Sequence, residues 1–504
     1  MNKRDKIWLA AILLIGLAVR IIALRTQYFI EPESFTYYAS VQQVIANHYQ
    51  IPSLLPLNGM PPHPYHEKAA LLYMPIVLTL FANWVFGLNI SVLAIMRWLP
   101  IAFGVAGILL AYLAARKLTG STLAANAAAL AYAAMPAAIN ATAGGHYGGD
   151  VFTPVLVMAA FVFLMYGSGE KQRKRQITYA AATAISTVAV LALWNGGIYL
   201  LPIMVLAVIM VIAAKSVGYR AVLIIAACGL LLSLAYLAVT MHLYAPTNTL
   251  PATQSFFFAY ALVSPFLVAA YLLLAQREGK ETHLYFALML PMLVVTFALA
   301  VYTPTWQDLL ALPMAVFAGA GLYAVAKAIG GLQARTIVVV AAVLAYLVVA
   351  ALTAWPVTQA YTYTPPFFEA LQWLRNSTPP TATVFSQWSD GAAIEAVASR
   401  QVYANAWSAH DGPILNVSSF LLGQNATALS QVRPDYVVVR YLWFSPNGYK
   451  DIAADGHFDP PAFYQRTNFY TLLYHCAPVC AIDNVTFVEQ FANKDTIIYK
   501  AIYT

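Results

Sequence analysis

The sequence feature that most limits how this chain can fold is a series of apolar runs near 20 residues, recurring from residue 7 to residue 355. Each run, as a helix, is long enough to cross the ~30 Å hydrocarbon core of a bilayer. The chain is 61% hydrophobic and 9% charged, whereas soluble globular proteins carry about 25% charge. These values exclude a soluble globular protein and predict a polytopic α-helical membrane domain. The basic start of the chain precedes an apolar run without a small-residue cleavage site, so we interpret it as a retained first helix.

Clusters of lysine and arginine predict which helix ends face the cytoplasm, because cytoplasmic loops are enriched in both. Placing every cluster inside gives an odd number of crossings, roughly 11 to 13, in a multi-pass protein of the cell membrane with a cytoplasmic N-terminus. A full crossing by residues 69–88 would put Arg116 and Lys117 outside. We therefore expect 69–88 to be an external or interfacial helix in a long first external loop, residues 25–90. The clusters are Lys3, Arg4 and Lys6; Arg116 and Lys117; Lys171 to Arg175; Lys215 and Arg220; Arg277 and Lys280; and Lys327 and Arg335.

Charge differs between a transmembrane domain expected over residues 1–358 and an extracytoplasmic domain expected over 359–504. The first holds 19 Lys+Arg and 9 Asp+Glu, and the second holds 8 and 11. The basic excess therefore follows membrane topology and requires no nucleic acid partner. Of the three cysteines, Cys228 lies in an apolar run. Cys476 and Cys480 have too few partners nearby for a zinc site, but a disulfide between them is plausible in an oxidising exterior.

Five acidic residues of the membrane half fall on the side opposite the basic clusters. They are Glu31, Glu33, Glu67, Asp150 and Asp308. Most stand in three short external segments, IEPESFTYY (30–38), AGGHYGGDVF (143–152) and YTPTWQD (302–308). Carboxylates from separate loops that converge are what a hard divalent cation requires, whereas each acid taken singly is also compatible with an ordinary solvated loop residue.

From residue 360 the pattern changes to that of an α/β domain. A helix is predicted over FFEALQWLRNSTP and a strand over TATVFSQW, followed by a turn at Ser389, Asp390 and Gly391. A helix over AAIEAVAS, another over VSSFLLGQNATALSQV and a β-branched strand in PDYVVVRYLWF complete the alternation. About 140 residues are enough for a separate core.

The stretch from Trp373 to Trp407 resembles the catalytic subunit of oligosaccharyltransferase, most closely its short archaeal AglB type. The resemblance rests on a Trp-Leu-Arg helix end that reaches Pro379, and on the tetrapeptide Trp388-Ser389-Asp390-Gly391, which stands where that family has WWDYG. The residues that follow in register are Ile394, Ala398, Arg400, Val402 and Asn405. The likeness extends to the loops of the membrane half. It implies a glycosyltransferase C type fold and an enzyme of protein N-glycosylation.

Carried over residue by residue, the resemblance places the catalytic acid of the first loop at Glu33, with Glu31 as the near alternative. The acid pair of the second loop falls on Gly148 and Asp150, so one acid is missing and His146 is a candidate to replace it. The resemblance thus implies Glu33 and Asp150 as catalytic residues, and these two with His146 as ligands of Mn²⁺ or Mg²⁺.

The remaining functional positions of the family depart from its pattern. The external-loop Glu that positions the acceptor falls near Gln254, and the Arg that neutralises the lipid phosphate falls at Trp306. His66 and Lys68 of the first loop are candidates to meet the phosphate instead. In the WWDYG motif, Trp388 and Gly391 agree; Gln387, Ser389 and Asp390 replace Trp, Asp and Tyr. We expect residues 388–391 to bind the acceptor.

The expected reaction moves a glycan from a dolichyl phosphate or pyrophosphate carrier to the Asn of an Asn-x-Ser/Thr sequence. The partners are thus the lipid-linked oligosaccharide, the acceptor polypeptide and the membrane, and we expect a single-subunit enzyme. One alternative is another polyprenyl-phosphate-dependent glycosyltransferase, such as a protein O-mannosyltransferase. The other is an inactive membrane scaffold or a transporter, although a transporter would show inverted repeats and mid-span charges.

Overall fold

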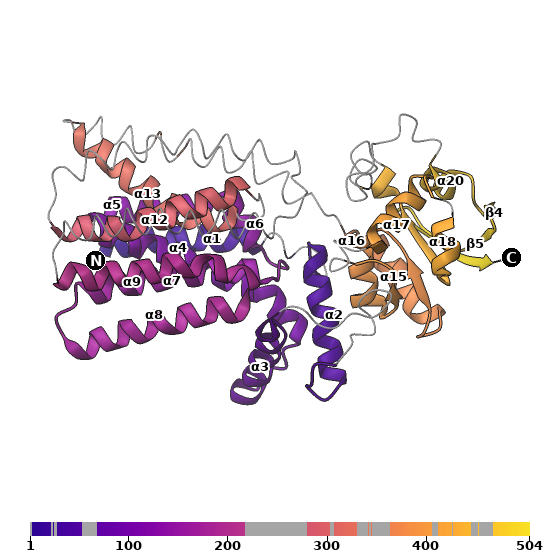
Figure 1. Ribbon diagram of the computed structural model, residues 1–504, viewed down its shortest axis with the longest axis horizontal. Helices are drawn as coiled ribbons and strands as arrows, with labels where there is room; N and C mark the ends of the chain where they lie inside the picture. The colour runs from indigo at the N-terminus through magenta and orange to yellow at the C-terminus, as the bar shows by residue number, and fades with distance from the viewer. Residues whose placement is uncertain are drawn as a thin grey trace. The chain divides into compact units, whose positions relative to one another are not determined.

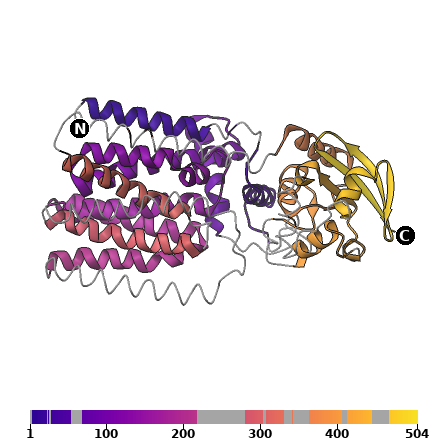
Figure 2. The same ribbon diagram turned by 90° about the horizontal axis from the view of Figure 1, so that it is seen from above.

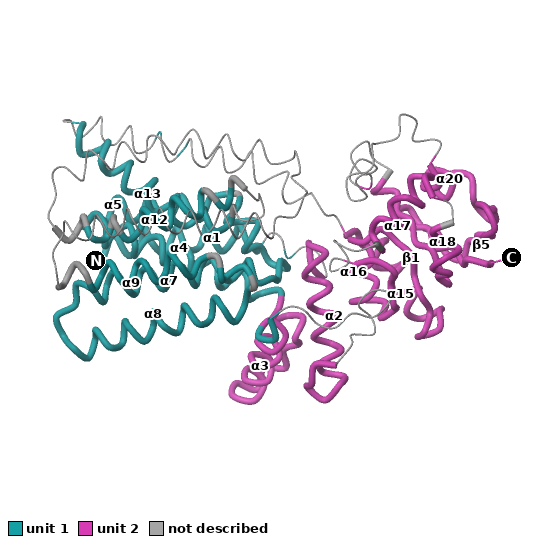
Figure 3. The backbone as a smooth tube through the Cα atoms, in the orientation of Figure 1, with its two compact units in different colours: residues 1–25, 68–70, 97–360 teal, residues 26–67, 71–96, 361–504 magenta. Residues whose placement is uncertain are grey.

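The computed structural model describes residues 3–21, 24, 28–52, 68–216, 280–302, 307–329, 341, 344, 363–405, 412–425, 427–444, 452 and 467–503. The chain divides into two compact units (Figure 3). Unit 1 comprises Met1–Arg25, Lys68–Ala70 and Arg97–Ala360, and unit 2 comprises Thr26–Glu67, Leu71–Met96 and Tyr361–Thr504. Most of the segment predicted as the first external loop, residues 25–90, is therefore grouped with the C-terminal residues in unit 2.

Unit 1 is a layered bundle of long apolar helices, many of them nearly parallel or antiparallel in both views (Figures 1 and 2). Its core consists of aliphatic side chains and methionines such as Ile108, Met158 and Leu288. The helices are α1 (Lys3–Ile21), α4 (Val92–Thr119, whose first residues belong to unit 2), α5 (Thr122–Ala134), α6 (Pro136–Ala141), α7 (Gly149–Ser168), α8 (Arg173–Leu193), the 3₁₀ helix η2 (Asn195–Leu200), α9 (Leu201–Ser216), α12 (Lys280–Tyr302) and α13 (Gln307–Ala328).

Small residues allow the central helices of unit 1 to pack closely. The alanine-rich helix α5 faces Gly319 of α13, where an added Cβ would lie 2.3 Å from the carbonyl oxygen of Ala124. Such small-residue contacts are how apolar helices associate where no hydrophobic effect drives them together. Prolines such as Pro154 and Pro313 interrupt helices without ending them, as is common in membrane helices.

Five described helices are long and apolar enough to cross a membrane, so the prediction of a polytopic membrane domain is confirmed. They are Ala69–Phe86, Val92–Thr119, Gly149–Ser168, Arg173–Leu193 and Asp308–Ala328. The spans predicted between residues 217 and 279 and, except for residues 341 and 344, between 330 and 362 lie outside the described residues. Helix α3 (Ala69–Phe86) is among the five by length and composition, and its expected place at the interface stays a prediction.

Unit 2 is built around a six-stranded mixed sheet with the strand order β2-β1-β3-β6-β5-β4. Strand β1 (Thr383–Phe385) pairs in parallel with β2 (Gln401–Val402) and β3 (Tyr436–Arg440). The C-terminal strands β4 (Val479–Ile482), β5 (Val485–Ala492) and β6 (Thr496–Tyr503) form an antiparallel meander that joins through β6 to β3. The core gathers side chains from strands and helices, among them Phe385, Phe420 and Tyr499.

The helices of unit 2 include two that follow α1 directly in sequence, α2 (Pro32–Ala46) and α3. The others are α15 (Pro365–Ser377), α16 (Trp388–Ala393), the π-helix η5 (Ile394–Ala398), α17 (Gly412–Leu421), α18 (Thr427–Val432), the 3₁₀ helix η7 (Tyr441–Phe444) and α20 (Asn468–Tyr474). Helix α2 packs directly against α16 and η5. A segment from the start of the chain thereby lies beside one from its last third.

Several predicted elements of the α/β domain are confirmed and others need correction. The helix before Pro379, the strands at 383–385 and 436–440 and the disulfide between Cys476 and Cys480 are present. The predicted turn at Ser389, Asp390 and Gly391 is wrong, because these residues lie inside α16. The single helix predicted over 417–432 is two helices, α17 and α18, with Gly423 between them at a φ of 76°, a backbone conformation that favours glycine.

Candidate active site

The first-loop acids Glu31 and Glu33 stand at the start of α2 and have different roles there. Glu31 is the N-cap: its carboxylate accepts hydrogen bonds from the backbone N–H of Glu33 at 3.1 Å and of Ser34 at 3.2 Å, and from the Ser34 hydroxyl. A cap of this kind satisfies N–H groups that the first helical turn leaves without partners. The sequence left Glu31 open as an alternative to Glu33 for the catalytic acid. The structure gives the Glu31 carboxylate a structural role as the cap of α2.

Glu33 occupies the first turn of α2, where the helix dipole favours a negative charge. The hydroxyl of Tyr37, one turn further along, donates to Glu33 Oε1 at 3.1 Å, and Tyr37 is itself buried. Glu33 remains partly exposed. This acid is therefore oriented by a buried phenol and accessible, which are properties that a base or metal ligand requires.

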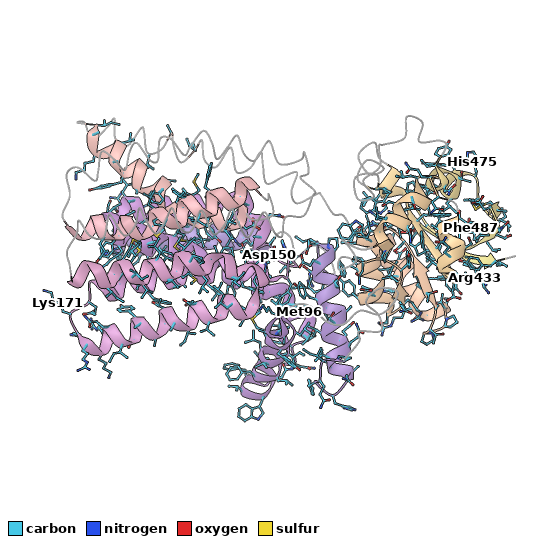
Figure 4. The ribbon with its side chains drawn as sticks, in the orientation of Figure 1. Met96, Asp150, Lys171, Arg433, His475 and Phe487 are labelled. Atoms are coloured by element: carbon cyan, nitrogen blue, oxygen red, sulfur yellow. A yellow bond between two sulfur atoms is a disulfide. The ribbon has the colours of Figure 1, made fainter. Side chains whose placement is uncertain are left out.

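The second-loop residues His146 and Asp150 lie together in unit 1. His146 Nε2 is 3.8 Å from Asp150 Oδ2. Figure 4 shows Asp150 at one end of α7 and Lys171 beyond the other end, an arrangement that suits helix ends facing opposite sides of a membrane. The imidazole is nearly buried, whereas the Asp150 side chain is 32% exposed.

The hydrogen bond on the far side of the imidazole selects its tautomer. His146 Nδ1 lies 2.9 Å from the carbonyl oxygen of Asn140, which can only accept, so Nδ1 is the nitrogen that carries the proton. In neutral His146 the lone pair therefore resides on Nε2 and faces the Asp150 carboxylate. Two acceptors facing each other fit a cation between them, and a second-shell carbonyl on Nδ1 is the usual support of a metal-binding histidine.

The described residues contain no group of three or more His, Cys, Asp or Glu side chains placed to hold one metal ion. Asp308, at the start of α13, lies close enough to Asp150 and His146 to interact with both charges. Glu33 belongs to unit 2, so the ligand set expected from the sequence is divided between the two units. The fit to a divalent cation rests on the His146–Asp150 pair.

Residues 388–391 form the first turn of α16. Trp388 is partly exposed and packs against the core of unit 2, and the Ser389 hydroxyl is buried without a hydrogen-bond partner. The hydroxyl of Tyr363 donates to the Ser389 carbonyl oxygen at 2.9 Å. At Gly391 an added Cβ would lie 2.1 Å from the carbonyl oxygen of Ala404. Gly391 is therefore required for the close approach of α16 to the segment after β2.

Asp390 is almost completely buried, and both of its carboxylate oxygens are engaged. Arg440 donates to Oδ1 at 2.8 Å and the Trp443 indole N–H donates to Oδ2. Burial raises the pKa of Asp390 above its ordinary value, and Arg440 and Trp443 oppose that shift. Asp390 thereby anchors α16 to the end of β3, and its expected contact with the acceptor stays a prediction.

Arg440 was missed by sequence reasoning although it connects several parts of unit 2. It bridges Asp390 and Asp495, and its guanidinium lies 4.0 Å from the centroid of the Phe367 ring. Although burial lowers the pKa of Arg440, the two carboxylates raise it above its ordinary value. The available signal was a lone arginine at the end of the otherwise apolar strand YVVVR, where every residue is buried.

Arg400, part of the motif that carried the family resemblance, has a structural role. Its guanidinium donates to the carbonyl oxygens of Arg375 and Thr378 at 2.7 and 2.6 Å, and to those of Ala398 and Ser399 at 3.0 and 3.2 Å. It thus closes the C-terminal ends of α15 and η5 together, where helices leave carbonyls without partners. This joint cap holds the helix end at Arg375 and the later motif residue Arg400 next to each other.

The other expected site residues are less informative. Gln254, His66 and Trp306 lie outside the described residues. Lys68 is described, at the start of α3, and is partly exposed. Its expected role at a lipid phosphate stays a prediction.

Residues 21–262 match the family model described as oligosaccharyl transferase STT3, N-terminal. This N-terminal part of the chain is thus similar to that family. The matched region contains Glu33, His146 and Asp150, so the similarity covers the candidate acids themselves. A comparison with curated protein sequences finds no match.

Solved structures agree with the STT3 assignment at the level of the fold. The archaeal oligosaccharyltransferase AglB from Archaeoglobus fulgidus, in complex with an inhibitory peptide and a dolichol-phosphate, is 17% identical, with a TM-score of 0.65 over 91% of this chain and 72% of that one. The Archaeoglobus fulgidus oligosaccharyltransferase tethered to an acceptor peptide with an NVT sequon is 17% identical, with a TM-score of 0.67 over 92% of this chain and 72% of that one. Its complex with Zn and sulfate is 18% identical, with a TM-score of 0.61 over 98% of this chain and 73% of that one.

A second relative in fold is ArnT from Cupriavidus metallidurans, which is 13% identical, with a TM-score of 0.55 over 99% of this chain and 98% of that one. Both likenesses extend over more than 90% of this chain. The predicted glycosyltransferase C type architecture is therefore confirmed.

Proposed function

We propose that this chain is an STT3-family glycosyltransferase, which moves a glycan from a dolichyl phosphate or pyrophosphate carrier to the Asn of Asn-x-Ser/Thr sequences and acts as a single subunit. The observation that carries the proposal is the packing of α2, which bears Glu33, against α16, which bears residues 388–391. The candidate base and the candidate acceptor site thus share one unit. The peptides and the dolichol-phosphate in the archaeal relative's structures support the choice of acceptor and carrier.

Glu33 is proposed to activate the acceptor amide. An amide nitrogen is a poor nucleophile because resonance with the carbonyl group ties up its lone pair. A carboxylate that accepts hydrogen bonds from the side-chain N–H groups of the acceptor Asn weakens that conjugation and can take a proton as the new bond forms. Tyr37 keeps the carboxylate in one orientation, and Glu31 fixes the helix turn that presents it.

His146 and Asp150 are proposed to hold Mn²⁺ or Mg²⁺, together with Glu33 as the family resemblance implies. When bound, such an ion would stabilise the negative charge that develops on the departing phosphate oxygens. The chain contributes the selected tautomer of His146 and the partly exposed carboxylate of Asp150. An imidazole ligand favours Mn²⁺ slightly over Mg²⁺.

Residues 388–391 are proposed to test the acceptor for its Ser or Thr hydroxyl. The partly exposed Trp388 supplies an indole N–H, and Ser389 supplies a hydroxyl that has no other partner. An acceptor without the hydroxyl would leave the Ser389 hydroxyl unpaired, which is how a hydrogen-bonding site rejects an analogue. Asp390 acts through Arg440 and Trp443 to hold this turn in place. Gln254 is the proposed additional acceptor contact, and His66, Lys68 and Trp306 are proposed near the lipid phosphate.

The alternative that one observation favours is a different polyprenyl-phosphate-dependent glycosyltransferase, because the fold is shared with ArnT over nearly the full length of both chains. The acceptor separates the two functions. The test uses purified full-length protein, lipid-linked oligosaccharide and a fluorescent Asn-x-Thr peptide, with and without Mn²⁺. The proposal predicts a Mn²⁺-dependent gel shift of this peptide and no shift of its Gln-x-Thr analogue. Equal shifts of both peptides, or none, would overturn it.

A further inference from the structure

Arg20, in the last turn of α1, is a fully buried cation in the membrane half. Its Nε donates to Thr142 Oγ1 at 2.7 Å, and its terminal nitrogens donate to the carbonyl oxygens of Gly16 at 3.1 Å and of Ala133 and Ala138 at 3.4 Å. These acceptors are all neutral. Charged side chains within membrane domains are rare and usually serve function, so this burial requires an explanation.

The explanation begins with the break between α5 and α6. Pro136 has no N–H to continue the hydrogen bonding of α5, and Met135 before it is extended, with φ of −71° and ψ of 123°. Carbonyls at such a break lack some of their helical partners, and no water is available in a bilayer to replace them. A guanidinium offers five N–H donors in a fixed plane. Arg20 donates to carbonyl oxygens on both sides of the break, those of Ala133 and Ala138, and the second of these also accepts from the backbone N–H and the hydroxyl of Thr142.

The main chain and a neighbouring helix are adapted to this arginine. The backbone N–H of Gly144 donates to the carbonyl oxygen of Arg20 at 3.1 Å, so the loop after α6 is tied to the end of α1. On α4, a Cβ added to Gly104 would lie 2.3 Å from Arg20 Nε. Glycine at this position therefore makes the space that the guanidinium occupies.

Helix α6 connects Arg20 to His146. Ala138 within α6 and Thr142 at its C-terminal cap accept hydrogen bonds from the guanidinium. Between them, the carbonyl oxygen of Asn140 accepts the hydrogen bond from His146 Nδ1 at 2.9 Å. The same short helix is thus fixed by the buried cation and in turn fixes the imidazole. A displacement of α6 would release the bond that selects the tautomer of His146.

We infer that Arg20 is a positioning residue for the His146–Asp150 pair, acting through α6. The consequence for metal binding rests on the proposed function, whereas the orientation of His146 does not. Arg20 does not itself meet substrate, because it is fully buried. Its charge is used to order a helix break beside the candidate site.

The first test measures the exposure of His146 and requires neither metal nor sugar. Full-length protein in detergent is treated with diethyl pyrocarbonate, which acylates accessible imidazoles, and labelling is quantified by mass spectrometry. The exposed His475 is the internal reference. We expect Arg20→Met to raise the labelling rate of His146 at least about 5-fold relative to His475, and Arg20→Lys to do so less, because an ammonium cannot reproduce the planar set of bonds.

A matched control and a milder variant keep this test decisive. Arg116→Met removes the same group from α4, 12 residues beyond Gly104 and about 18 Å along the helix, and should leave His146 protected. Thr142→Val removes the Nε partner, together with the bond from the Thr142 hydroxyl to the Ala138 carbonyl oxygen, and should raise labelling in a chain that folds. Unchanged labelling of His146 in folded Arg20→Met would overturn the inference. If Arg20→Met does not fold, unchanged labelling in Thr142→Val would do the same.

The second test asks whether Arg20 acts through His146 on metal affinity. Mn²⁺ binding is measured by electron paramagnetic resonance for the wild type, Arg20→Met, His146→Ala and the double variant. We expect each single variant to weaken binding about 10-fold or more and the double variant to be no weaker than His146→Ala, because one path carries both effects. Additive losses would contradict the inference. A wild-type protein that binds no Mn²⁺ would contradict the proposed metal role. The labelling test, which requires no metal, would still decide the role of Arg20.

Discussion

The ring of Tyr363 packs against that of Phe35 with centroids 4.8 Å apart, and the Tyr363 hydroxyl donates to the Ser389 carbonyl oxygen. Phe35 belongs to the helix of Glu33, and Ser389 belongs to the helix expected to bind the acceptor. One buried tyrosine thus contacts both. Contact between these two helices places residues far apart in the sequence within one unit.

Tyr363→Phe should weaken the acceptor site while leaving the ring contacts in place. Loss of one buried hydrogen bond costs about 1 kcal/mol of stability. Because α16 would then be held less firmly, the peptide KM should rise several-fold, with a smaller change in kcat. Steady-state kinetics with varied peptide and thermal unfolding in detergent would measure both. Tyr49→Phe, at an exposed tyrosine, is the control. A Tyr363→Phe enzyme with an unchanged KM would argue against the coupling.

Glu33→Gln and Glu31→Gln should separate chemistry from helix capping. A general base contributes roughly 10²–10⁴ in rate, so we expect Glu33→Gln to lose at least about 100-fold in kcat with an unchanged melting temperature. Loss of an N-cap costs about 1 kcal/mol, so Glu31→Gln should lower the melting temperature and keep activity within a few-fold. The reverse order of rate losses would show that Glu31 is the reactive acid.

Asp150→Asn should raise the Mn²⁺ requirement. We expect a chelator to abolish transfer by the wild type and Mn²⁺ to restore it, with the variant requiring about 10-fold or more metal for half-maximal rate. Glu170→Gln, just beyond the opposite end of α7, should behave as the wild type. Full activity of the chelated wild type would contradict the assignment of Asp150 and His146.

Arg440→Met should destabilise unit 2 strongly, because it leaves the carboxylates of Asp390 and Asp495 without their shared cation. Removal of one partner from a buried ion pair costs about 3–5 kcal/mol. Arg433→Met, at an exposed arginine, should cost no more than about 1 kcal/mol. Thermal unfolding monitored by tryptophan fluorescence would compare the two. Similar melting temperatures for both variants would show that the buried network is dispensable.

Sequence reasoning predicted the parts of this protein that depend on local pattern. Apolar runs gave the membrane helices, and the spacing from Trp373 to Asn405 led to the family. The pairing of Glu33 with residues 388–391 in one unit was not predictable, because it is a contact between distant segments with no local signature. The sequence instead placed Glu33 in the transmembrane domain.

Two buried arginines also escaped prediction. Arg20 stands near the end of an apolar run, where a basic residue is usually interpreted as a marker of membrane topology. Three of its four neutral partners lie more than 100 residues away. Arg440 ends an apolar strand, and its partners Asp390 and Asp495 lie 50 and 55 residues away. A charged residue in an apolar segment indicates that its side chain is buried, but it does not identify the residues that the side chain contacts.

The most direct test of the proposed function locates the transferred sugar on the acceptor. Purified full-length protein is incubated with lipid-linked oligosaccharide, Mn²⁺ and a peptide containing one Asn-x-Thr sequence and additional Ser and Thr residues. The product is fragmented by electron-transfer dissociation. We predict the glycan mass on the Asn alone, and its absence from the product of Glu33→Gln. A sugar on Ser or Thr would assign the chain to the alternative class, and no sugar on any residue would contradict the account.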